Sequence, residues 1–230
     1  KQLKKSVLRI ADKVSDSCEF SAIRQSLITL IPLLIVGYGS LMITSLPIPP
    51  YQKFLNGLCD GKVVETLTLM HKGVNDFFAV ILAVTTSVSY SVKRRSKAGA
   101  YVGIGDTIIL AIITLAAFAT YSGISHKDFS VQSLGNMNVF TALLIALISA
   151  NIFFAMRNSR IFRLKRQGVN TDSIYIESLE GIWPAVTIVL LFAVLHQLLH
   201  VVFHVDGVQE LLENIVNYLL RSLNNGFGEG

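Results

Sequence analysis

Charged residues are scarce in this chain, and their scarcity excludes an ordinary soluble domain. They make up 15% of the residues, whereas hydrophobic residues make up 52%. Soluble domains carry roughly 25% charged residues. The charges are also segregated, so that long windows contain none. The net charge of +5 does not indicate a nucleic-acid partner, because the basic residues flank apolar stretches and do not line one folded face.

Cysteine is almost absent as well. Cys18 and Cys59 lie on opposite sides of the first apolar stretch, so they cannot pair within one chain, and no metal-type spacing is present. Nucleotide-binding loops and nucleophile–base pairs are also lacking, so we predict no catalytic residue, metal or cofactor in this chain. No cleavable signal is visible. Because the chain starts at Lys1 without Met and stops at Gly230, we expect it to be part of something longer.

Long apolar stretches are what the chain has instead. A helix needs about 17–25 mostly apolar residues to cross the roughly 30 Å hydrocarbon core of a bilayer. Five stretches meet or approach this length, namely 27–46, 77–92, 102–121, 139–156 and 183–203. The second is the weakest, and Lys93 and Arg94 could complete it by extending toward the interface. We therefore expect an all-α integral membrane protein with a bundle of about five transmembrane helices.

The basic residues predict the orientation of this bundle. Fifteen of the 20 lysines and arginines fall on one side of the five stretches, in the N-terminal segment and two of the connecting loops. Positive residues favour the cytoplasmic side of a membrane. We therefore expect a multi-pass protein of a bacterial inner membrane with a cytoplasmic N-terminus and an outside C-terminal end.

Two further helices are expected at the membrane surfaces. In the basic segment 1–26, residues 3–14 form an amphipathic pattern that suits the anionic cytoplasmic leaflet. In the segment 204–230, apolar residues recur at helical spacing, and we expect an outer-side amphipathic helix that leads to a missing C-terminal half. Between the first two stretches, the prolines of 47–51 predict an extended exit from the first helix.

Asp106 is the most conspicuous polar residue, because a carboxylate inside a membrane helix costs roughly 2.5–3.5 kcal/mol. Residues 103–106 read GIGD, a Gly-x-Gly-Asp pattern seen in intramembrane aspartyl proteases. That chemistry needs a second carboxylate, and none lies inside the five stretches. A structural role is favoured, because the start of a helix stabilises an anion. Its candidate partners are Lys93, Arg94, Arg95 and Lys97. A role in transport or sensing stays open.

Three histidines form a second candidate feature. His196, His200 and His204 recur every four residues, so they share one face of the last stretch, and Asp206 follows them. Three histidines and a carboxylate could hold zinc. Four-residue steps drift by about 40° each, however, so three ligands on one straight helix do not converge easily on one ion. We favour a polar stripe that packs toward neighbouring helices or lies near the outer interface.

Several segments, taken in order, resemble one known family. They are SAIRQS at 21–26, LIPLLIVG at 30–37, FTALLIALISA at 140–150 and SLEGIWP at 178–184. These segments are similar to the first, fourth and fifth spans of the membrane permease subunit, enzyme IIC, of the phosphotransferase system, in its lactose/cellobiose/chitobiose branch. The resemblance covers nearly the whole chain.

This resemblance implies a function. The chain would be the N-terminal scaffold and dimerisation half of a sugar permease, which takes part in the coupled uptake and phosphorylation of a di- or oligosaccharide. Its partners would be the lipid bilayer, a second copy of itself and a cytoplasmic IIB-like phosphocarrier subunit. Family members are about twice as long and hold the sugar in their C-terminal half, so no substrate-binding residue can be assigned here.

Two alternatives remain. The segment 169–177 and residues 121–123 depart from the family's pattern. They keep open a permease-like sensory domain that regulates a fused cyclic-di-GMP signalling enzyme. An intramembrane enzyme, which would depend on Asp106, is the other alternative.

Overall fold

The structure is a computed structural model that describes residues 17–98, 103–123, 134–159 and 178–203, and these are helical throughout apart from short turns. Four helices are long and apolar enough to cross a membrane. A fifth span is counted if 49–76 and 78–96, which meet at a bend of 51°, are taken as one. The all-α membrane fold expected from the sequence is confirmed. The amphipathic segments 3–14 and 204–230 lie outside the described residues.

The first helix, α2 (Cys18–Ser45), is longer than the apolar stretch that predicted it. It begins nine residues before Leu27, because the Ser17 side chain caps it by accepting a hydrogen bond from the Phe20 backbone N–H at 3.1 Å. Pro32 lies inside the helix. Membrane helices tolerate proline when neighbouring groups form hydrogen bonds with the backbone groups that it leaves unpaired. The expected boundary at residue 26 therefore falls within a continuous helix.

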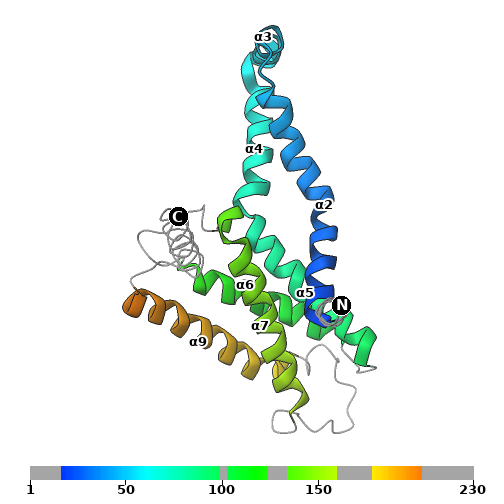
Figure 1. Ribbon diagram of the computed structural model, residues 1–230, viewed down its shortest axis with the longest axis vertical. Coiled ribbons are helices and arrows are strands. Elements are labelled where there is room, and N and C mark those ends of the chain that lie inside the picture. Colours follow the sequence, from blue (N-terminus) through cyan, green and yellow to red (C-terminus); the bar gives the residue numbers. More distant parts are fainter. Residues whose placement is uncertain (1–16, 99–102, 124–133, 160–177, 204–230) are drawn as a thin grey trace, which may run out of the picture.

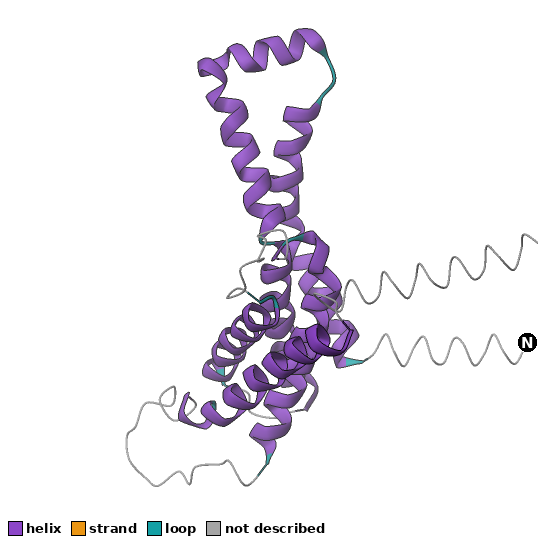
Figure 2. Ribbon diagram, turned by 90° about the vertical axis from the view of Figure 1, so that its left-hand side faces the viewer, coloured by secondary structure: helices purple, strands orange, loops and turns teal. Residues whose placement is uncertain are grey.

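The segment after α2, residues 46–76, is mostly helical, although no helix was predicted there, and it forms a hairpin together with α2. The extended exit is limited to residues 46–48, and α3 (Pro49–Gly57) starts with two prolines at its first positions, where proline is tolerated. A tight turn, η1 (Leu58–Gly61), has three consecutive residues at positive φ and leads into α4 (Lys62–Asp76). Figures 1 and 2 show this hairpin of α2, α3 and α4 projecting beyond the other helices.

Close packing holds α4 against α2. Gly37 is buried at their contact, and a Cβ atom placed there would lie 2.7 Å from the Cβ of Val74. His71 lies beside the same residue, with its ring Nδ1 3.2 Å from the Gly37 carbonyl oxygen. Only glycine therefore allows the two backbones to approach this closely.

The remaining helices form the bundle in the lower part of Figure 1. They are α5 (Phe78–Ala98), α6 (Ile104–Tyr121), α7 (Val139–Asn158), which follows the short turn η3 (Asn136–Asn138), and α9 (Ile182–Leu198), which continues as a π-helix, η5 (Leu199–Phe203). Helix α5 packs against α2, α6 and α7, and α9 packs against α6 and α7.

The core of the bundle combines small, branched aliphatic and aromatic residues. Its fully buried members include Leu110, Ala117, Phe118, Ala146, Phe153, Ile188 and Phe192. Large apolar residues such as Ile112, Leu190 and Val194 are exposed on the outer faces of α6 and α9. An apolar exterior around an apolar core is the arrangement expected when lipid is the solvent.

Candidate functional site

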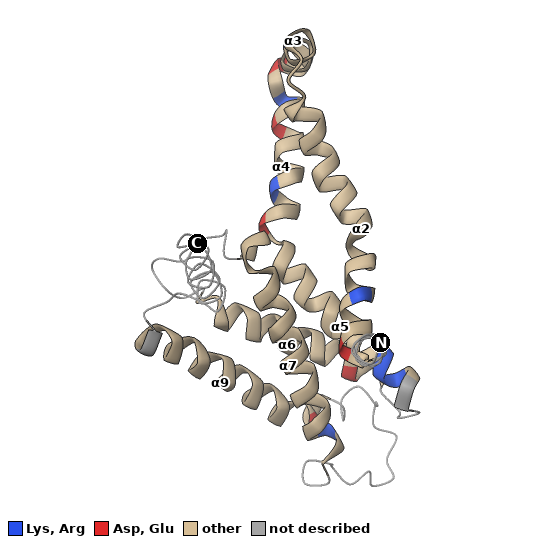
Figure 3. Ribbon diagram, viewed as in Figure 1, with Lys and Arg blue, Asp and Glu red and all other residues tan. Residues whose placement is uncertain are grey.

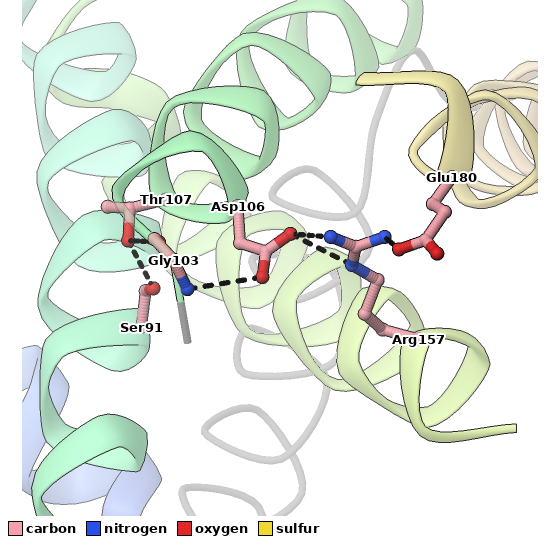
Figure 4. A network of polar contacts seen from close by, with 6 residues as sticks. All are labelled: Ser91, Gly103, Asp106, Thr107, Arg157 and Glu180. Atoms are coloured by element: carbon pink, nitrogen blue, oxygen red, sulfur yellow. Dashed lines mark hydrogen bonds and ion pairs between the residues drawn. The ribbon is translucent and has the colours of Figure 1, made fainter. Parts of the chain in front are cut away.

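An ion-pair network joins three helices at one end of the bundle (Figure 4). Arg157 of α7 lies between two carboxylates: its guanidinium donates to Asp106 Oδ1, through Nε at 2.8 Å and through a second nitrogen, and to Glu180 Oε2. The three side chains are largely buried, at 8% to 15% exposed. The other oxygen of Asp106 accepts the Gly103 backbone N–H at 3.3 Å. We call Asp106, Arg157 and Glu180 the ionic clamp.

Each charge in the ionic clamp also matches the helix end that carries it. Asp106 lies in the first turn of α6, Glu180 lies just before the start of α9 at Ile182, and Arg157 lies in the last turn of α7. Helix N-termini favour anions and C-termini favour cations, each by about 0.3–1 kcal/mol. The clamp therefore joins two helix starts to one helix end, with ion pairing and helix dipoles acting in the same direction.

The expected partners of Asp106 were wrong. The cation that binds it is Arg157, not Lys93, Arg94 or Arg95; the side chain of Lys97 lies outside the described residues. Arg94 is engaged elsewhere, since it donates to the Tyr90 hydroxyl at 3.2 Å and lies 4.9 Å above the Phe154 ring.

Hydroxyl and amide groups extend the network sideways into α5. Ser91 and Thr107 share a hydrogen bond of 2.7 Å between α5 and α6 (Figure 4). The Tyr90 hydroxyl donates to Asn151 Oδ1 at 2.7 Å and so joins α5 to α7. Together with the ionic clamp, these contacts hold all four bundle helices in one polar layer.

The geometry of the clamp does not support acid–base chemistry. An aspartyl-protease dyad needs two carboxylates that share one proton. Asp106 and Glu180 instead lie on opposite sides of the guanidinium, and each accepts hydrogen bonds from it (Figure 4). The arrangement gives Asp106 a buried cation partner, and its structural role stays a prediction.

Only His196 and His200 of the three histidines lie among the described residues. The His196 ring makes an edge contact with Tyr121 of α6, with ring centroids 6.1 Å apart. His200 lies in the π-helix η5 and is exposed, while His204 lies outside the described residues. Among the residues that the structure describes, no group of three or more His, Cys, Asp or Glu side chains could hold a metal ion.

A second polar cluster, which was not predicted from the sequence, lies where the hairpin leaves the bundle. Asn136, in the turn before α7, donates at 2.6 Å both to the Tyr38 hydroxyl and to Asn75 Oδ1. Tyr38 also makes an edge contact with His71, at 5.6 Å between ring centroids. This cluster ties the hairpin to the bundle at the end opposite the ionic clamp. The only sequence signal was a small group of asparagines outside the apolar stretches.

No family model matches the chain, but curated relatives do. Over 175 residues it is 26% identical to the permease IIC component YwbA of Bacillus subtilis, covering 70% of this chain and 38% of that protein. Over 167 residues it is 25% identical to the cellobiose-specific EIIC component of Geobacillus stearothermophilus, covering 66% and 35%. A lichenan permease IIC component of Bacillus subtilis is 23% identical, covering 70% and 37%. The chain thus matches little more than a third of the length of these relatives.

A solved structure shares the fold. The crystal structure of ChbC, the IIC component of the N,N'-diacetylchitobiose-specific phosphotransferase system, superposes with a TM-score of 0.75 at 18% identity. The match covers 97% of this chain and 52% of that transporter. Sequence and fold together relate this chain to the IIC permease components of the phosphotransferase system, of the lactose/cellobiose/chitobiose type.

Proposed function

We propose that the chain is the N-terminal scaffold and dimerisation half of a phosphotransferase-system sugar permease that takes part in the uptake and phosphorylation of a di- or oligosaccharide. The observation that carries the proposal is the structural match to ChbC, which extends over 97% of this chain but only 52% of the transporter. The described residues form a bundle with an apolar core, joined at one end by the ionic clamp. Such a bundle suits a scaffold, and the sugar site would lie in the half that the match does not include.

The polar layer would mark the cytoplasmic face of this scaffold. It lies beside the end of α5 and the end of α7, next to the basic loops that the positive-inside rule places in the cytoplasm. From Cys18, whose sulfur lies 4.0 Å from the Tyr90 carbonyl oxygen, to Tyr38 in the opposite cluster, α2 rises about 30 Å at 1.5 Å per residue. That distance is about the thickness of the hydrocarbon core.

The hairpin would then extend beyond the outer face of the bilayer, which shifts the expected first span of 27–46 toward the N-terminus. Helix α4 carries charged residues along its length, as Figure 3 shows. Such a helix is costly to place in hydrocarbon. The hairpin also exposes Met42, Phe54 and Leu69, each with more than 60% of its surface accessible. A second copy of the chain would cover these side chains, and the hairpin is therefore the proposed dimer contact.

The dimer contact can be tested by mass measurement of the purified protein in detergent. Replacing Met42 and Leu69 with serine is expected to shift the dimer toward the monomer. The matched control is Val194→Ser, which removes a comparable exposed apolar side chain from α9 on the bundle. A double variant that remains as dimeric as the control would place the contact elsewhere.

The permease function is tested by sugar uptake in cells that lack their own β-glucoside transporters. Cells that express the full protein together with its phosphocarrier subunits are expected to accumulate radiolabelled cellobiose or chitobiose as the sugar phosphate. Cells without the IIB-like subunit should accumulate neither. Accumulation of free sugar without the phosphocarrier, or no uptake of any di- or oligosaccharide, would overturn the proposal.

A further inference from the structure

A groove between α2 and α5 is lined by residues of these two helices alone. Its volume is about 500 Å³. Its polar lining consists of Gln25 and Thr29 from α2 and of Thr85, Ser89, Lys93 and Ser96 from α5. Polar groups on the outer surface of two membrane helices need a partner, because lipid tails cannot hydrogen-bond to them. Neither the ionic clamp nor the proposed dimer contact uses this groove.

The polarity of the groove changes along its length. At the deep end, the hydroxyls of Thr29 and Thr85 bond back to their own helices, to the Gln25 and Ile81 carbonyl oxygens at 2.9 and 2.7 Å. The hydroxyls of these two threonines therefore already have an acceptor within their own helices. Val84, Val88 and Val92 complete an aliphatic wall along α5.

The other end of the groove presents unused donors. The side chains of Gln25, Ser89, Lys93 and Ser96 make no hydrogen bond or ion pair within the described part of the chain. One ammonium, one amide and two hydroxyls thus face the same space, and none of the lining residues is a carboxylate. With one positive charge and no negative charge, this lining favours an anion over a cation.

The groove has the shape and polarity of a phospholipid site. From Lys93 to Val84 the helix rises about 13 Å, from the charged end of the span toward its middle. Basic pockets between membrane helices near the cytoplasmic surface bind anionic headgroups. A sugar is disfavoured as occupant, because none of the lining residues is aromatic and the valine wall offers no hydrogen bonds.

We propose that the groove between α2 and α5 binds one anionic phospholipid, with its phosphate at Lys93, Ser89 and Gln25 and an acyl chain along Val92, Val88 and Val84. The lipid comes from the leaflet that faces the basic end of the helices. It fills the seam between the two helices that join the hairpin to the bundle.

Native mass spectrometry of the full protein in detergent tests this site. Delipidated protein is titrated with phosphatidylglycerol and, separately, with phosphatidylcholine carrying the same acyl chains. One phosphatidylglycerol is expected to bind more tightly than phosphatidylcholine. Lys93→Gln should weaken it about fivefold, as expected for loss of one basic contact to a lipid. The matched control is Arg95→Gln, which removes an exposed charge two residues away on the same helix end and should leave the affinity within about twofold.

A second variant distinguishes lipid binding in the groove from lipid binding by general surface charge. Val88→Phe keeps Lys93 but fills the aliphatic part of the groove, and it should also abolish the selective binding. Equal binding of the two lipids, equal losses for Lys93→Gln and Arg95→Gln, or unchanged binding in Val88→Phe would each overturn the proposal. Displacement of the lipid by millimolar inorganic phosphate would show a simple anion site and would overturn it as well.

The last alternative is that protein covers the groove. A spin label at Ser89→Cys, in a background with Cys18→Ser and Cys59→Ser, should be broadened by a lipid-soluble relaxation agent in proteoliposomes. A label that is shielded from the agent would show that a protein segment occupies the groove, and the lipid proposal would fail.

Discussion

Removal of the Arg157 side chain is predicted to destabilise the bundle more than any other loss of a single charge among the described residues. Arg157→Met leaves Asp106 and Glu180 facing each other, with side chains that are 8% and 15% exposed. Breaking a buried ion pair by removing one partner costs about 3–5 kcal/mol. We expect a value near the lower limit, about 3 kcal/mol, because Asp106 keeps the Gly103 N–H bond and the dipole of α6.

Conservative variants separate charge from geometry. Arg157→Lys keeps the charge but cannot donate to both carboxylates in a fork, so it should lose one charged hydrogen bond, about 1.5 kcal/mol. Asp106→Asn removes the negative charge but can still accept hydrogen bonds. In the double variant with Arg157→Met, the two effects should be coupled by about 1–3 kcal/mol, as expected for groups in direct contact.

The assay is unfolding in mixed micelles of increasing SDS content, followed by helical circular dichroism. The matched control is Arg95→Met, an exposed arginine at the end of α5, which should change the free energy of unfolding by about 0.5 kcal/mol or less. The reasoning would be refuted if Arg157→Met behaved like Arg95→Met. Strictly additive effects of Asp106→Asn and Arg157→Met would refute it equally.

The other predictions concern the contacts of α2. Gly37→Ala should cost about 1–3 kcal/mol, because its Cβ would lie 2.7 Å from the Cβ of Val74; Gly39→Ala, where no atom lies within 4 Å, should be neutral or stabilising in the same unfolding assay. Thr86→Val removes the 2.9 Å bond to the Ser26 hydroxyl and should cost about 0.6 kcal/mol, the average for such bonds between membrane helices. If Thr86→Val costs as much in a Ser26→Ala background, the bond contributes nothing.

The helices of the bundle could be predicted because their apolar stretches are long enough to be stable only as membrane-spanning helices. A stretch such as 139–156 carries no charge, and the corresponding helix is Val139–Asn158. Helix α4 escaped prediction because charged residues along its sequence, among them Lys62, Glu65 and Lys72, resemble those of a loop. The helical spacing of Val63, Leu67 and Val74 was the signal that could have revealed it.

The partner of Asp106 could not be found by searching nearby in the sequence. Lys93, Arg94 and Arg95 are close along the chain, but the end of α5 directs Arg94 toward Tyr90 and Phe154. Arg157 lies 51 residues away and meets Asp106 because the end of α7 packs beside the start of α6. A signal was present in the orientation argument itself, since the same basic count placed Asp106 and Arg157 on one side of the membrane.

The account depends on the proposed orientation of the chain, with the ionic clamp on the cytoplasmic side, and the two native cysteines test it directly. Cys59 is exposed at the tip of the hairpin, and Cys18 is half-buried at the opposite end of α2. In intact spheroplasts, a membrane-impermeant maleimide is predicted to label Cys59, and labelling should be lost in Cys59→Ser. Cys18 should become reactive only after permeabilisation. Labelling of Cys18 in intact spheroplasts, with Cys59 protected until permeabilisation, would contradict the account.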